Sequence, residues 1–276
     1  MRTSFLDKIL FIILLVLSAI FVFPVFVVLI NSFKLKFSIA ATPFILPNKD
    51  NFTGFANYTE GIRSTGFPSA FGWSLFVTVF SVAAIIIFTS MTAWYIVRVK
   101  NLFNTILYYA LVFSMIVPFQ MVMFTMSKTA NVLGLDNPIG IIILYLGFGA
   151  GLSVFMFSGF IKTVPKGIEE AATIDGCNTL QVFWRVVFPV LKPTAITVAI
   201  LNTMWIWNDY LLPYLVIGND YKTIPIAIQY LKGGYGSVDM GAMMAMLVLS
   251  IIPVIIFYLL CQKYIIKGVA SGAVKG

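Results

Sequence analysis

Long apolar stretches alternate with shorter polar connections along the whole chain. Each stretch holds about 20 or more mostly apolar residues, the length that an α-helix needs to cross about 30 Å of hydrocarbon. A membrane barrel would instead show short strands of alternating polarity. The pattern therefore predicts an all-α integral membrane protein with six spans, near residues 9–33, 72–97, 104–126, 139–161, 193–217 and 241–265.

Composition agrees with this pattern. Hydrophobic residues make up 60% of the chain and charged residues only 10%, whereas about a quarter of the residues of a soluble domain are charged. The first apolar run, from Ile9 to Leu29, is longer than the roughly 7 to 15 apolar residues of a signal peptide, and no clear cleavage site follows it. We expect it to persist as the first spanning helix.

The distribution of Lys and Arg predicts the orientation, because cytoplasmic loops carry an excess of these residues. With both termini in the cytoplasm, eleven of the 18 basic residues lie on the inner side, although Lys34 and Lys36 run against the bias. This topology explains the net charge of +8. No nucleic-acid partner is expected, since no loop shows a basic stripe interleaved with aromatic residues. The eleven inner residues are Arg2, Lys8, Arg98, Lys100, Lys162, Lys166, Arg185, Lys192, Lys263, Lys267 and Lys275.

The residue inventory offers little for catalysis or cofactor binding. The chain has no histidine and only two cysteines, Cys177 and Cys261, which disfavours a zinc site. It contains no Gly-Lys dipeptide, so the phosphate-binding GxxxxGK[ST] signature is absent. We expect no catalytic residues and no bound metal or cofactor.

The cytoplasmic loop at residues 162–192 is the longest inner connection, and its pattern predicts a helix-turn-helix. A first helix after Pro165 would carry Glu169 and Glu170 near its positive end and stop at Asp175-Gly176. A second helix would start at Asn178 or Thr179, both good N-caps. One face of it would hold the apolar side chains Leu180, Phe183, Trp184, Val187 and Leu191.

Two interpretations of this loop follow from its residues. The small residues Ala171 and Ala172 would let the cleft of another protein close over the first helix, with a glutamate facing a cationic wall. Alternatively, the helix rests on lipid, in which case its polar face should carry Lys and Arg for anionic headgroups. The helix presents two glutamates, which favours the protein partner.

The same stretch resembles the EAA loop of permease subunits from ABC importers. The matching residues are Glu170-Ala171-Ala172, Asp175-Gly176, Phe183 and Val187 before Pro189, with Cys177 where the family commonly has Ala. Further segments are similar to the MalG-like subunit of maltose-type carbohydrate importers: NSFK at 31–34, WNDYLLP at 207–213, TIPIAI at 223–228 and the C-terminal sequence at 262–276.

The resemblance implies the type I ABC importer permease fold as one transmembrane domain over residues 1–276, with a coupling loop at 162–192 and a cytoplasmic tail at 267–276. It implies a heterodimer with a sister permease, two copies of an ATPase subunit that use ATP and Mg²⁺, and an extracytoplasmic sugar-binding protein that delivers the sugar. In the family, the EAA loop sits in a cleft of the ATPase and the tail inserts between the ATPase subunits. The coupling role is thereby assigned to Glu170, Ala171, Ala172, Asp175 and Gly176.

Competing function classes explain the sequence less well. An ion-coupled secondary transporter usually keeps ionisable residues inside the membrane, but the six predicted spans contain a single carboxylate, Asp209. An intramembrane enzyme would need paired aspartates, a Ser/His pair or HExxH, none of which is present. A purely structural subunit leaves the acidic tip of the loop unexplained.

The fifth span carries the candidate substrate pathway. Trp205, Asn208 and Asp209 lie at i, i+3 and i+4 and so would share one helical face, where an indole beside amide and carboxylate groups suits a sugar. Two alternatives remain open: the aromatic residues form the belt at the outer interface, or Asp209 caps or braces a neighbouring helix. In the last outer loop, the apolar TIPIAIQYL at 223–231 packs either on an external partner or on its own chain.

Overall fold

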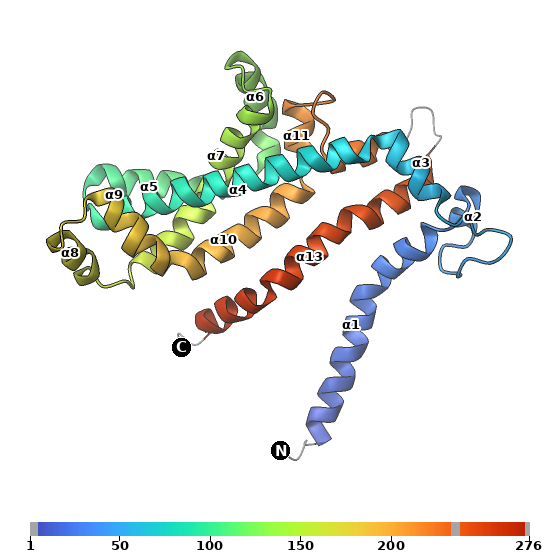
Figure 1. The fold of residues 1–276 in the computed structure, drawn as a ribbon, viewed down its shortest axis with the longest axis horizontal. Helices are drawn as coiled ribbons and strands as arrows, with labels where there is room; N and C mark the ends of the chain where they lie inside the picture. Colours follow the sequence, from blue (N-terminus) through green and yellow to red (C-terminus); the bar gives the residue numbers. More distant parts are fainter. Residues whose placement is uncertain (1–4, 233–237, 274–276) are drawn as a thin grey trace. The chain divides into compact units, whose positions relative to one another are not determined.

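The computed structural model describes residues 5–232 and 238–273, and side chains as far as Tyr264 (Figure 1). Within these residues the chain is helical, and its extended pairing is limited to an isolated antiparallel bridge between Lys34 and Phe52. The all-α prediction is confirmed. The helices are α1 Phe5–Asn31, α2 Lys36–Ala41, α3 Ala56–Thr65, α4 Phe67–Arg98, α5 Leu102–Ser114, α6 Phe119–Val132, α7 Pro138–Ile161, α8 Gly167–Ile174, α9 Thr179–Val182, the π-helix η1 Phe183–Val187, α10 Phe188–Asn208, α11 Leu211–Val216, α12 Ile224–Gln229, the 3₁₀ helix η2 Tyr230–Lys232 and α13 Met240–Ala273.

Five helices of the described chain are long and apolar enough to cross a membrane, and a bent helix pair brings the number to six if it counts as one span. The five are α1, α4, α7, the continuous helix Thr179–Asn208 and α13 up to Tyr264, and the pair is α5 with α6. Four of the predicted spans thus correspond to single continuous helices, and the other two differ as follows.

The predicted span at 104–126 is not one continuous helix. The structure divides it into α5 and α6, which meet at an angle of 108°. Pro118 is the N-cap of α6. A proline has no N–H to donate to the preceding turn, and it disfavours helical backbone at the residue before it. The apolar run therefore continues past Pro118, whereas the helix ends before it.

The predicted span at 193–217 is shifted toward the N-terminus. Its helix begins at Thr179 in the preceding loop and ends at Asn208. Asp209 follows with extended backbone (φ −74°, ψ 125°), and the short helix α11 starts at Leu211. The second helix of the predicted helix-turn-helix and the fifth predicted span therefore form one continuous helix.

The chain divides into two compact units, which are described separately. Unit 1 comprises Met1–Ala70 and Ala227–Val254. In it, the Asn57 amide donates to the backbone oxygens of Ser32 (2.9 Å) and Lys34 (2.8 Å). Lys34 is fully buried and donates from Nζ to Thr42 O at 2.6 Å. Burial lowers the pKa of Lys34, and these bonds order the start of the loop that follows α1.

Unit 2 comprises Phe71–Ile226 and Ile255–Gly276. Its core is built around α7, which contacts both α5 and α10 (Figure 1) and places Tyr145 and Phe157 in fully buried positions. Gly149 permits the close packing: a Cβ there would lie 2.9 Å from Asn202 Oδ1 of α10 and 2.6 Å from Ile85 Cδ1 of α4. A side chain at this position would displace Ile85 and Asn202, so glycine suits the place where α4, α7 and α10 meet.

The apolar segment TIPIAIQYL, in the loop before α13, is largely buried within this chain. Ile224 and Ile226 are 2% and 0% exposed, and the backbone N–H of Ile224 donates to Ser74 Oγ at 2.8 Å. Of the two interpretations of TIPIAIQYL, the structure favours packing on its own chain.

Candidate functional site

The loop at 162–192 has the predicted helix-turn-helix form. Helix α8 runs from Gly167 to Ile174, and the second arm starts at Thr179 and continues through η1 into α10. We call residues 167–187 the hairpin. Figure 1 shows its two arms, α8 and α9, beside the C-terminal end of α4.

The turn of the hairpin is held by backbone hydrogen bonds and by a capping box. Gly176 has φ +87°, which side chains disfavour, and its N–H donates to Thr173 O at 3.1 Å. The N–H of Cys177 donates to Ala172 O at 3.0 Å. Asn178 and Gln181 then form a capping box, each side chain accepting from the other residue's backbone N–H at 2.9 Å. The tip is therefore ordered by local bonds and has a defined shape.

The five residues assigned to coupling do not share one environment. Glu170, Ala171, Asp175 and Gly176 are exposed, whereas Ala172 is only 9% exposed and belongs to the core of unit 2. Its small side chain is thus used for packing within this chain. The surface left for a partner consists of the four exposed residues, together with Ile174, which is 86% exposed.

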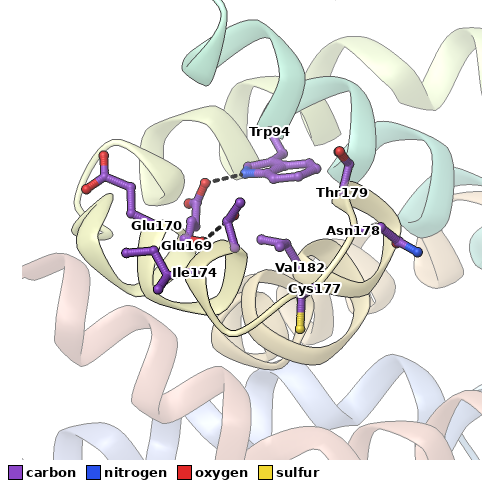
Figure 2. A pocket seen from close by; sticks show the side chains of 9 residues that line it. Trp94, Glu169, Glu170, Ile174, Cys177, Asn178, Thr179 and Val182 are labelled. Atoms are coloured by element: carbon purple, nitrogen blue, oxygen red, sulfur yellow. Dashed lines mark hydrogen bonds between the residues drawn. The ribbon is translucent and has the colours of Figure 1, made fainter.

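A groove of about 630 Å³ lies between the arms of the hairpin and α4. Figure 2 shows Glu169 directed toward Trp94, while the side chain of Glu170, at the edge of the groove, points in a different direction. An exposed carboxylate, an exposed isoleucine and a groove on one rigid tip can contact a protein surface. The lining residues are Trp94, Glu169, Glu170, Thr173, Ile174, Cys177, Asn178, Thr179 and Val182.

Glu169 has a role that the sequence alone did not reveal. Interpretation of the sequence favoured Glu170 and left Glu169 as a favourable charge near a helix start, but Glu169 pairs with Arg98 at 2.6 Å and accepts a hydrogen bond from Trp94 Nε1 at 3.0 Å. A signal was present, since Trp94 and Arg98 are four residues apart at the end of a span and share a face. The sequence did not show which loop they meet.

The apolar face predicted for the second arm is only partly realised. Phe183, Val187 and Leu191 are at most 2% exposed, but Leu180 is 59% and Trp184 is 43% exposed. The arm passes through the π-turn η1, which changes the angular position of residues on either side of it. A regular helix would place the Pro189 ring against the carbonyl of the residue four positions earlier. The wider turn directly before Pro189 avoids this clash.

The candidate pathway residues are brought together only in part. Trp205 and Asp209 both meet Tyr145 of α7: the rings of Trp205 and Tyr145 lie 5.5 Å apart, and Tyr145 donates its hydroxyl proton to Asp209 Oδ2 at 3.0 Å. Asn208 is exposed and donates to Met204 O. The shared helical face is lost at Asp209, because its Oδ1 accepts from the Leu211 N–H at 3.0 Å and starts a new turn. Bracing, one of the alternatives left open, is favoured.

Among the described residues, no group of three or more His, Cys, Asp or Glu side chains is placed to hold a metal ion.

Residues 85–271 match the family described as binding-protein-dependent transport system inner membrane component. The chain is 38% identical over 262 residues to the probable starch degradation products transport system permease protein AmyC of Thermoanaerobacterium thermosulfurigenes, covering 95% of this chain and 94% of that protein. It is 34% identical over 271 residues to the multiple sugar-binding transport system permease protein MsmG of Streptococcus mutans, covering 96% of both.

A solved structure has the same fold. A chain in the crystal structure of a bacterial ABC transporter involved in the import of the acidic polysaccharide alginate superposes with a TM-score of 0.76 at 26% identity, over 96% of this chain and 99% of that one. Together these similarities favour an ABC importer permease over an ion-coupled secondary transporter.

Proposed function

Because this chain belongs to the binding-protein-dependent transport system inner membrane component family, we propose that it forms, with a sister permease, the pathway by which a sugar or oligosaccharide enters the cell. The chain is a multi-pass membrane permease of an ABC importer. The observation that carries the proposal is the ordered, exposed hairpin, which continues without interruption into the spanning helix α10.

The substrate class is proposed from the relatives. Proteins with related sequences over nearly the whole chain are named for starch degradation products, for multiple sugars and for melibiose, raffinose and stachyose. A sugar or short oligosaccharide is the chemistry that these names share. It would arrive on an extracytoplasmic sugar-binding protein.

The energy source is proposed to lie in another chain. With no GxxxxGK[ST] sequence here, two copies of an ATPase subunit would bind and hydrolyse ATP with Mg²⁺. Both termini and the hairpin would lie in the cytoplasm with that ATPase. The C-terminal tail at 267–276 is proposed to contact it as well, but its side chains lie outside the described residues.

The hairpin is suited to transmit the motion of such a partner. Glu170, exposed at the first turn of α8, offers a carboxylate for a cationic side chain in the ATPase cleft. A push on the tip reaches α10 because the second arm and α10 form one helix, Thr179–Asn208. ATP-driven closure would thereby move a spanning helix.

The test uses the complex co-purified from its native host and reconstituted in liposomes with its binding protein. Labelled starch hydrolysate, raffinose and arabino-oligosaccharides are offered in turn, and uptake is measured with and without ATP. ATP-dependent uptake of at least one sugar is expected. Uptake driven by an ion gradient without ATP would contradict the proposal.

Glu170→Lys is expected to lower uptake and stimulated ATP hydrolysis at least about tenfold, because it replaces the attraction to a cationic cleft by repulsion. Glu60→Lys is the matched control, since Glu60 is also exposed but lies on α3 of the first outer loop. Normal uptake by an assembled Glu170→Lys complex would remove Glu170 from the coupling contact.

A further inference from the structure

The last turn of α4 is bonded to the hairpin by a shielded ion pair. Arg98 donates to Glu169 Oε1 from Nη2 at 2.6 Å and from Nε at 2.9 Å, and the two side chains are only 14% and 12% exposed. Each charge also lies at the helix end that favours it, Arg98 in the last turn of α4 and Glu169 in the first turn of α8. Ion pairs removed from water are screened less than surface pairs, so salt should weaken this contact less than it weakens an exposed pair.

Two further hydrogen bonds fix the orientation of the hairpin relative to α4. Arg98 Nη2 also donates to Val164 O at 3.0 Å, five residues before Glu169, and Trp94 Nε1 donates to Glu169 Oε2 at 3.0 Å. The Trp94 ring packs against Phe183 of η1 with centroids 5.5 Å apart. One turn of α4 therefore touches the chain before α8, α8 itself and the second arm.

We propose that Arg98, Trp94 and Glu169 form a strut that holds the hairpin in fixed register with α4, so that one movement of the hairpin drives both α4 and α10. This inference rests on the proposed function. The residues act by positioning the hairpin, and none of them needs to touch the ATPase or the sugar.

The adjacent glutamates of α8 then have separate tasks. Successive residues on an α-helix point about 100° apart, since 3.6 residues make one turn. Glu169 faces α4 and its side chain is largely buried, while Glu170 points outward and is exposed (Figure 2). The strut leaves the second carboxylate free for a partner.

The decisive measurement is the number of sugar molecules taken up per ATP hydrolysed, in the same reconstituted complex and with the sugar that the wild type takes up best. A defect in folding or assembly lowers uptake and hydrolysis together and leaves this ratio unchanged. Loss of the strut would let the hairpin move without α4, so the ratio for Glu169→Gln is expected to fall about tenfold. Lys100→Gln is the control, because Lys100 is an exposed cation two residues beyond Arg98.

A charge-swapped double variant tests whether the ion pair itself matters, as opposed to each charge acting alone. The double variant Arg98→Glu with Glu169→Arg restores the ion pair but neither the Trp94 bond nor the bond to Val164 O. It should recover at least about a third of the wild-type ratio. A normal ratio in Glu169→Gln overturns the strut, and so does a double variant no better than Glu169→Gln.

A third variant covers a failure of Glu169→Gln to assemble. Arg98→Lys keeps the charge, but a single ammonium cannot reproduce the planar fork that spans Val164 O and Glu169. Its ratio should fall about threefold, and an unchanged ratio overturns the strut. If the wild-type complex shows no ATP-dependent uptake, the proposed function fails. If only the strut proposal is wrong, wild-type uptake stays intact and the variants keep the wild-type ratio.

Discussion

At the scale of single residues, the carboxylate of Asp209 lies where α10 ends, and both of its oxygens accept hydrogen bonds from this chain. Oδ2 accepts from the Tyr145 hydroxyl and Oδ1 from the Leu211 N–H. A carboxylate occupied on both oxygens has less capacity for a sugar hydroxyl than a free one. The geometry therefore supports a brace that joins α7, α10 and α11.

Tyr145→Phe tests this brace. The change removes one hydrogen bond to a charged group and keeps the ring against Trp205, so stability should fall by about 1.5–3 kcal/mol while the KM for uptake of the sugar stays within about twofold. Thermal unfolding of the complex and uptake kinetics provide the two measurements. Tyr95→Phe, at an exposed tyrosine of α4, is the control. A large rise in KM with unchanged stability would instead support the pathway assignment of Trp205 and Asp209.

Local sequence rules predicted the residues of the hairpin turn well. Gly176 as the left-handed residue and Asn178 as the N-cap both follow from backbone preferences within a few positions. The partner of Glu169 did not follow, because Arg98 is 71 residues away and its approach depends on how α4 meets the loop. The inward position of Ala172 likewise depends on tertiary packing.

At the scale of elements, the continuity of the second arm with α10 is the feature that hydropathy misplaced. The hydrophobic pattern marks where the helix enters the hydrocarbon, near residue 193. The helix itself begins earlier, at Thr179, and continues to Asn208. The π-turn at Phe183–Val187 lets the chain pass Pro189 without a break. By contrast, Pro118 ends a helix, and α5 and α6 separate by 108°.

Arg185→Pro tests whether this continuity transmits motion. The Arg185 side chain is exposed, so its loss removes little packing, but a proline in the helix interior removes a backbone donor and clashes with the preceding turn at a cost of about 3 kcal/mol or more. Uptake should fall at least about tenfold in complexes that still contain the ATPase, as judged by co-purification. Arg185→Ala keeps the helix and should stay within about twofold. Normal transport by Arg185→Pro would show that the hairpin does not act through α10.

At the scale of the whole molecule, the spanning helices differ in how much of their surface this chain covers. Within unit 2, the apolar segment of α7 is 44% buried and that of the Thr179–Asn208 helix is 33% buried. The apolar side chains that remain uncovered on these helices must face lipid or another protein. This exposure supports the proposal of a sister permease.

The proposed topology places the hairpin in the cytoplasm and the first outer loop outside, and thiol labelling can test both positions in one background. With Cys177 and Cys261 replaced by Ser, a cysteine is introduced either at Ile174, which is 86% exposed at the hairpin tip, or at Lys49, which is exposed in the loop after α2. A membrane-impermeant maleimide should modify Ile174→Cys only in inside-out vesicles and Lys49→Cys only in right-side-out vesicles, because a charged reagent does not cross the hydrocarbon layer. Detergent-opened vesicles, in which both positions should react, control for access. The reverse pattern would put the hairpin outside the cell, away from any source of ATP, and would contradict its role as the contact for an ATPase.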